Sequence, residues 1–159
     1  MTARKRFRRI SIRQHLRPVP FRGERLRALV RKALRHVAPG AADLRILVVG
    51  DADMREWNRR FLNRPRTTNV LSFPEEELRD ALPGTLSGDI LISAPTCLRQ
   101  TRGWAGSPEE RVFFFIVHGL LHLAGHDHEQ GGEESRRMRR KEMDVYRSSL
   151  APPGRRGRG

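Results

Sequence analysis

The chain is short and strongly basic: its 159 residues include 32 Lys and Arg against 18 Asp and Glu, for a net charge of +14. This length suits one domain with a buried core, and no apolar stretch approaches the ~20 residues of a membrane span. The single cysteine excludes an internal disulfide and suits a reducing compartment, so we expect a cytoplasmic protein. The excess of Arg favours a polyanionic partner such as nucleic acid, although a merely solvated basic surface gives the same composition.

The spacing of apolar residues predicts a succession of helices and strands. Asp51 or Asp53 is expected to cap the second helix, with Trp57 and Phe61 on its buried face, and the segment 75–84 is expected to be an exposed loop. The predicted elements, in chain order, are a strand near Phe7, Ile10 and Ile12, a helix over Phe21–Val37, a buried strand over Leu44–Val49, a helix over Met54–Leu62, strands over Thr68–Phe73 and Asp89–Ser93, a short helix over Pro95–Gln100, a helix from Ser107 to near Gly125, and a last helix over Glu133–Leu150.

These elements predict an α+β fold for a single domain over residues 1–150. Its small mixed sheet, of about four strands, is expected to pack against several helices. Residues 151–159 contain only Ala, Pro, Gly and Arg, none of which can build a core there. We therefore expect a disordered basic tail, which either adds a loose electrostatic contact to RNA or is inert.

Four of the six histidines fall within eleven residues, at the end of the most apolar predicted helix. His118 and His122 are four apart, so their side chains share one helix face and can bind one small cation. Gly125 can take a positive φ and end the helix, which lets His128 return to the same point as a third ligand. Three protein ligands leave one tetrahedral position open for water, which is typical of a catalytic zinc site. The pattern predicts a zinc hydrolase, although three imidazoles also suit nickel, copper or cobalt.

One class of zinc protease has the same histidine spacing, with Glu directly after the first histidine as general base. Gly119 occupies that position and cannot accept a proton. A zinc metalloprotease is therefore the disfavoured alternative.

The run H-G-L-L-H-L-A-G-H-D-H over 118–128 resembles the signature H-G-x-L-H-L-x-G-Y-D-H of the bacterial YbeY family. Members of that family are rRNA maturation factors and single-strand-specific zinc endoribonucleases. The resemblance covers roughly residues 43 to 146. Further matches are Thr68–Pro74 to the family's T-[DN]-V-L-S-F-P strand, Gly88–Ile90 to its G-D-I strand entry, and Met138 with Glu142 to an M-x-x-x-E pattern on the last helix.

The resemblance implies one zinc ion per chain, held by His118, His122 and His128 on a zincin-like helix. It also implies a cytoplasmic enzyme whose partners are single-stranded RNA, ribosomal RNA and the ribosome, with no membrane and no DNA. Its expected role is maturation of the 16S rRNA 3′ end and ribosome quality control. A ribosome-assembly protein that binds RNA around a structural zinc, without catalysis, is a further alternative.

The chain departs from the family pattern at two positions. His126 stands where the family has Tyr. It packs or hydrogen-bonds as Tyr would, competes with His128 for the metal, or supplies a fourth ligand that fills the open site; we favour the first. By direct count, Leu62 after Phe61 occupies the position of a functional family Arg. Arg64 or Arg66 is expected to approach the same phosphate from the adjacent loop.

Asp127 lies between two histidines, where it either orients an imidazole or shapes the turn after the helix. Asp89 either orients an imidazole in the same way or caps a turn after Gly88. The attacking group in RNA cleavage is either water or the 2′-hydroxyl of the substrate, and the sequence does not distinguish these routes. Zinc and nearby Arg would neutralise the charge that develops on the phosphorus centre.

Overall fold

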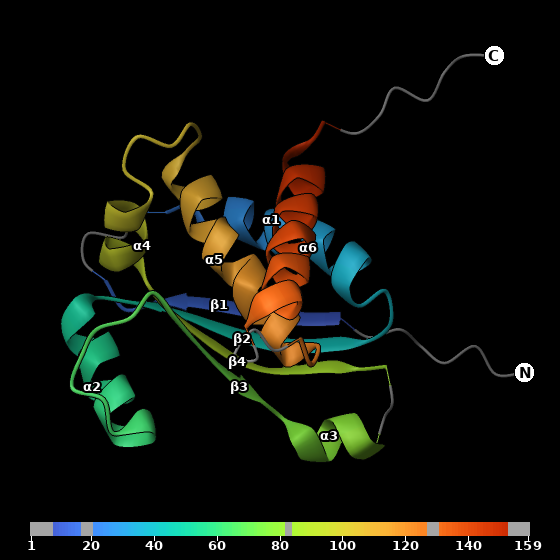
Figure 1. Cartoon of the computed structure of the whole chain (residues 1–159), viewed down its shortest axis with the longest axis horizontal. Helices are drawn as coiled ribbons and strands as arrows, with labels where there is room; N and C mark the ends of the chain where they lie inside the picture. Colours follow the sequence, from blue (N-terminus) through green and yellow to red (C-terminus); the bar gives the residue numbers. More distant parts are fainter. Residues whose placement is uncertain (1–7, 17–20, 82–83, 127–130, 153–159) are drawn as a thin grey trace, which may run out of the picture.

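The computed structural model describes residues 8–16, 21–81, 84–126 and 131–152, and its centre is one four-stranded sheet (Figure 1). The strand order is β1-β2-β4-β3, so that β1 and β3 form the two edges. β1 and β2 are parallel, as are β2 and β4, whereas β3 runs antiparallel to β4. The strands are β1 (Arg8–Gln14), β2 (Ala42–Val49), β3 (Val70–Pro74) and β4 (Leu86–Ser93).

Helices lie on both faces of this sheet (Figure 1). The long helices α1, α5 and α6 cover one face, whereas α2 and α3 lie on the other, and α4 continues from the end of β4. This arrangement confirms the predicted α+β fold with a mixed sheet. The helix bounds are α1 (Gly23–Val37), α2 (Asp51–Leu62), α3 (Glu76–Ala81), α4 (Ala94–Gln100), α5 (Pro108–Leu123) and α6 (Gly132–Leu150).

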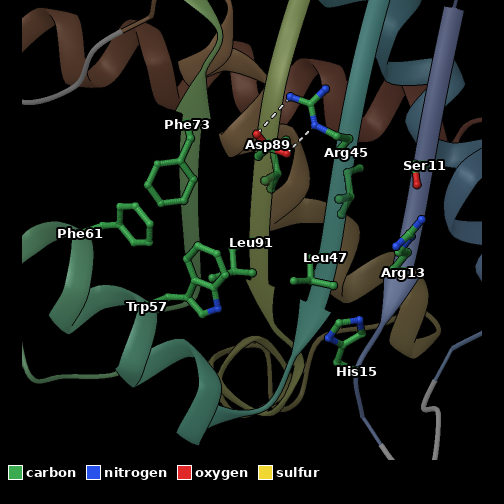
Figure 2. Close-up of a pocket in the computed structure, with 12 residues that line it drawn as sticks. Ser11, Arg13, His15, Arg45, Leu47, Trp57, Phe61, Phe73, Asp89 and Leu91 are labelled. Carbon is green, nitrogen blue, oxygen red and sulfur yellow. Dashed lines mark hydrogen bonds and ion pairs between the residues drawn. The ribbon is translucent and has the colours of Figure 1, made fainter.

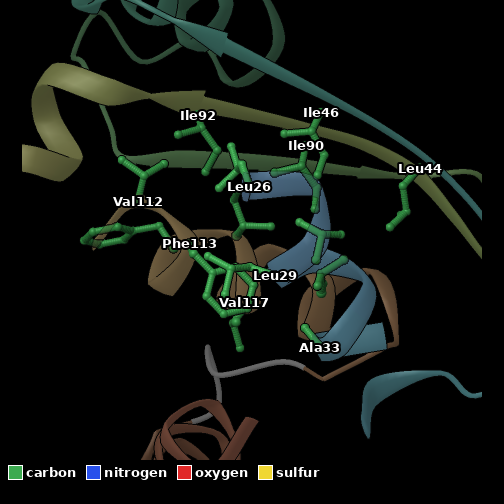
Figure 3. Close-up of a cluster of buried hydrophobic side chains, with 14 of the residues drawn as sticks. Leu26, Leu29, Ala33, Leu44, Ile46, Ile90, Ile92, Val112, Phe113 and Val117 are labelled. Carbon is green, nitrogen blue, oxygen red and sulfur yellow. The ribbon is translucent and has the colours of Figure 1, made fainter. Parts of the chain in front are cut away.

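The main core lies between the sheet and the three long helices, where apolar side chains of α1 and α5 meet those of β2 and β4 (Figure 3). Alternate residues of β4 point to opposite faces, so Ile90 and Ile92 join this core whereas Leu91 joins a smaller cluster with Met54 of α2. Each fully buried large side chain contributes about 1.5–3 kcal/mol. The sheet is therefore held rigidly against α5, the helix that carries the histidines.

Helix α5 begins and is buried as its sequence predicts. Ser107 is the N-cap residue, and its Oγ accepts a hydrogen bond from the Glu110 backbone N–H at 3.2 Å. Pro108 follows as the first helical residue, where it loses no helical hydrogen bond. The helix interior, including Phe113 and Leu120, is fully buried.

Three local predictions were wrong. The segment expected as an exposed loop contains α3, because its E-E-L-R-D-A run has good helix formers and its acidic first turn favours a helix N-terminus. Neither expected aspartate caps α2, whose N-cap is Gly50. Trp57 and Phe61 are 38% and 56% exposed rather than buried, because α2 instead buries Met54 against the sheet and Asn58 beside the loop that follows the helix.

Other expectations fall partly or wholly outside the described residues. Phe7, expected in the first strand, is one of these, and β1 begins at Arg8. Most of the expected tail, residues 153–159, is another. Within the described ranges, no helix is long and apolar enough to span a bilayer.

Candidate metal centre

The two helical histidines converge as the sequence predicted. One turn of α5 separates His118 and His122, and their Nε2 atoms lie 3.0 Å apart. The ring centroids are 4.6 Å apart, with the rings inclined at 63°. Both imidazoles therefore direct the same nitrogen toward one point beside the helix.

The opposite ring nitrogen of His118 has a fixed partner. Glu142 of α6 is only 7% exposed, and its Oε1 lies 2.9 Å from His118 Nδ1. An ionised carboxylate can only accept, so Nδ1 carries the hydrogen and the Nε2 lone pair of His118 points toward His122. The resemblance included Glu142 without giving it a role. An acidic residue on the apolar face of α6, in line with Met138 and Val145, was the sequence signal for this contact.

Two arrangements satisfy a 3.0 Å approach of these nitrogens. Either His122 donates its Nε2–H to His118, or both lone pairs bind one cation. Two nitrogens that bind one tetrahedral zinc at ~2.0–2.1 Å lie about 3.3 Å apart, close to the observed separation. The donor types, the distance and the carboxylate behind His118 thus fit zinc. Within the described ranges no third His, Cys, Asp or Glu completes a metal-binding group, and the predicted third ligand, His128, lies outside them, as does Asp127.

The chain turns sharply after α5, as predicted. Gly125 has a φ of 94°, which a side chain would strain, and the His126 backbone N–H returns to the Leu121 carbonyl at 3.0 Å. His126 Nε2 lies 3.1 Å from the Lys141 ammonium group. Burial and the charge of Lys141 lower the pKa of His126. The expectation that His126 hydrogen-bonds as Tyr would is consistent with this contact.

Gly119 faces the sheet. A Cβ at this position would lie 3.0 Å from Ser72 Oγ and 3.2 Å from side-chain carbons of Ile90. Ser72 Oγ also donates to the Gly119 carbonyl at 3.4 Å. At the position that carries the base in the protease class, any side chain would therefore crowd Ser72 and Ile90, and Gly119 itself has no group that accepts a proton.

The predicted phosphate-binding arginines lie on the segment between α2 and β3. Arg64 and Arg66 are exposed, and Asn58 Nδ2 donates to the Arg66 carbonyl at 2.7 Å, which fixes the backbone of this loop. The catalytic role of either side chain stays a prediction. Asp89 lies on the opposite face of the sheet from α5, where it accepts two hydrogen bonds from Arg45, so it neither orients a histidine nor caps a turn.

The described residues form a small α+β domain in which a mixed four-stranded sheet is covered by a helix that presents two convergent histidines. The family model described as endoribonuclease YbeY matches residues 10–149. The endoribonuclease YbeY of Geobacter metallireducens is 35% identical over 140 residues, which cover 87% of this chain and 93% of that protein. The Syntrophotalea carbinolica protein of the same name is 42% identical over 108 residues, covering 66% and 71%.

A solved structure agrees with these sequence matches. The solution structure of TM1509 from Thermotoga maritima has a TM-score of 0.60 and 25% identity, and the match covers 92% of this chain and 99% of that one. The chain belongs to the endoribonuclease YbeY family, as its motifs predicted.

Proposed function

We propose that this protein is a zinc-dependent endoribonuclease that cleaves single-stranded segments of ribosomal RNA. The proposed role is maturation of the 16S rRNA 3′ end and ribosome quality control, in the cytoplasm. The observation that carries the proposal is the 3.0 Å approach of His118 Nε2 and His122 Nε2, with Glu142 behind His118. Family membership and the net charge of +14 support RNA as the substrate.

His118, His122 and His128 would hold the zinc ion. When bound, zinc supplies a Lewis acid that polarises phosphoryl oxygens and makes hydroxide available near neutral pH. Glu142 keeps the hydrogen of His118 on Nδ1, so that Nε2 presents its lone pair. Arg64 or Arg66 is proposed to bind the scissile phosphate, and Asp127 to orient an imidazole. The nucleophile is water or the substrate 2′-hydroxyl, which product ends distinguish because only 2′-hydroxyl attack gives a cyclic phosphate.

Metal content and RNA cleavage of matched variants test this proposal. The unmodified protein is expected to purify with about one zinc and to cleave unstructured RNA, with activity lost in chelator and restored by zinc. His122→Ala should lose metal and cleavage while it keeps its fold. His36→Ala, an exposed histidine at the end of α1, is the matched control and should keep both.

Other outcomes contradict the proposal in different ways. If His122→Ala and the metal-free protein both unfold globally, the metal is structural, as in a non-catalytic RNA-binding protein. Cleavage that persists in chelator and in His122→Ala would place the chemistry elsewhere.

A further inference from the structure

The face of the sheet turned away from α5 carries a cavity of about 640 Å³ that the proposed metal centre does not use (Figure 2). We call it the open-face groove. Its volume lies within the ~300–1,000 Å³ of pockets that bind small ligands. The residues that define it here are Trp57 and Phe61 of α2, Phe73 of β3, Leu91 of β4, Leu47 of β2 and Arg13 of β1.

One wall of the groove consists of aromatic rings. Trp57 and Phe61 stack with ring centroids 5.0 Å apart and planes 10° from parallel, and Phe73 lies 5.3 Å beyond Phe61. Four large hydrophobic side chains are exposed within the described part of the chain, and three of them, Trp57, Phe61 and Leu62, belong to α2. Aromatic rings exposed in a groove, rather than scattered singly, mark a binding surface.

The groove is flanked by positive charge. β1 contains three arginines and no carboxylate, and residues 51–66 contain five arginines and three carboxylates. The carboxylate that lines the groove, Asp89, accepts hydrogen bonds from Arg45 Nε at 2.7 Å and Nη2 at 3.1 Å (Figure 2). Asp89 is thus held by an arginine, although Arg45 also bonds Glu75 at 3.3 Å, and Arg13 places a positive charge at the β1 side of the groove.

We propose that the open-face groove docks single-stranded RNA, with a base on the Trp57 and Phe61 rings and the backbone phosphates toward Arg13. Planar rings accept the π-face of any base, and flanking arginines bind phosphate, which is the usual chemistry of single-strand recognition. A duplex keeps its bases stacked inside, so this surface selects unpaired RNA. The choice of RNA as occupant rests on the proposed function.

The position of β3 explains how one strand of RNA reaches both sites. β3 is an edge strand, and its consecutive residues Ser72 and Phe73 point to opposite faces. Ser72 contacts Gly119 beside the histidines, whereas Phe73 lines the groove. An RNA strand that passes around this edge contacts the groove with one segment and the metal centre with another. The groove therefore holds substrate and takes no part in the reaction itself.

The two tryptophans of the chain provide a direct test. Trp104→Phe leaves Trp57 as the only tryptophan, and His122→Ala in the same chain removes cleavage from the measurement. Titration with oligo(A) or oligo(U) of about ten nucleotides should quench Trp57 fluorescence to saturation, more strongly for the purine. Duplex RNA should not. The matched control is Trp57→Phe with His122→Ala, in which Trp104, on the segment before α5, should give no quenching.

Affinity measurements with labelled oligo(A) identify the occupant. Trp57→Leu keeps an apolar side chain without a π-face and should weaken RNA binding about tenfold. Arg13→Gln should weaken it more than Arg31→Gln, an exposed arginine of α1 across the sheet. In the cleaving protein Trp57→Leu should raise KM and leave kcat nearly unchanged.

The results that overturn this inference differ from those that overturn the proposed function. If RNA is cleaved but binding leaves Trp57 fluorescence unchanged, or Trp57→Leu binds RNA normally, the docking surface is wrong and the nuclease stands. An apolar protein segment would then be the better occupant of the groove. If RNA is neither bound nor cleaved, the proposed function fails first.

Discussion

Glu142 Oε1 lies 2.9 Å from His118 Nδ1, although the two residues are 24 positions apart and belong to different helices. The contact is shielded from water, since Glu142 is 7% exposed. A buried carboxylate behind a histidine fixes the tautomer and the ring orientation, and it raises the basicity of the other nitrogen. Helix α6 therefore positions the candidate metal ligand that α5 carries.

Glu142→Ala should weaken zinc binding about 10–100-fold, because the His118 ring loses its partner. Glu142→Gln should lose less, since an amide oxygen still accepts the Nδ1 hydrogen. Competition with a chelator measures the affinity, and urea unfolding of the metal-free proteins separates it from stability. Glu133→Ala is the control, since the Glu133 side chain is 81% exposed at the start of α6. Equal zinc affinity in all of these variants would contradict a positioning role.

Gly88 permits the close approach of β3 and α5 at the start of β4. Its φ is 154°, and a Cβ would lie 2.5 Å from the Phe73 carbonyl oxygen and 2.8 Å from a Leu123 methyl group. Gly88→Ala should therefore lower the free energy of unfolding by at least about 2 kcal/mol, as measured by urea denaturation. Gly103→Ala is the matched control: its φ is 84° with open space around it, so only backbone strain of about 1 kcal/mol is expected. Equal losses would show that packing at Gly88 is unimportant.

Asp51 attaches α2 to the end of β4 and to α4. Its carboxylate accepts hydrogen bonds from Ser93 Oγ at 2.7 Å, Thr96 Oγ1 at 2.6 Å and Arg99 Nη2 at 2.7 Å. Burial opposes ionisation, but the hydrogen bonds from Thr96, Ser93 and Arg99 outweigh it and lower the pKa of Asp51 from 3.8 to about 2.

The unfolded chain therefore binds this proton more tightly than the folded chain does. The stabilisation, about 2 kcal/mol, is present above pH ~4 and is lost as the pH falls toward 2. Asp51→Asn should lower stability at pH 7 by about that amount and flatten the pH dependence between about 4 and 2. Urea unfolding at several pH values checks this, with Asp53→Asn, an exposed residue of the same helix, as the control. If the unfolding free energy of Asp51→Asn keeps the same dependence on pH, the Asp51 carboxylate is not the source of that dependence.

The features that were predictable from the sequence depend on local signals, whereas those that were not depend on contacts between residues far apart in the chain. Helix α5 was predictable because Ser107, Pro108 and the apolar run are local signals, and the convergence of His118 and His122 follows from helix geometry alone. The burial of Glu142 had a sequence signal, but its partner His118 was not predictable, because the packing of α6 on α5 is tertiary. A pattern shows that α6 has an apolar face, but it does not show which residue of another helix that face meets.

The error at α2 has a similar cause. Spacing placed Trp57 and Phe61 on one side of the helix correctly, and they do stack on each other. The inference that this side is buried failed, because only the end of α2 near Met54 packs on the sheet while the aromatic pair lines the open-face groove. Aromatic residues that violate the usual burial rule are informative about binding.

The buried thiol of Cys97 can be used to test how α4 packs. It is 0% exposed in α4, and burial, together with the charge of Asp51, raises the pKa of its thiol. Because the thiolate is both the nucleophile and the metal ligand, a thiol reagent should modify native Cys97 at least about a hundredfold more slowly than the unfolded chain. Ser148→Cys in a Cys97→Ala background gives an exposed matched thiol on α6, which should react at once. Asp51→Asn should speed the modification of Cys97, because α4 then opens more often. Rapid modification of the native protein would contradict this burial.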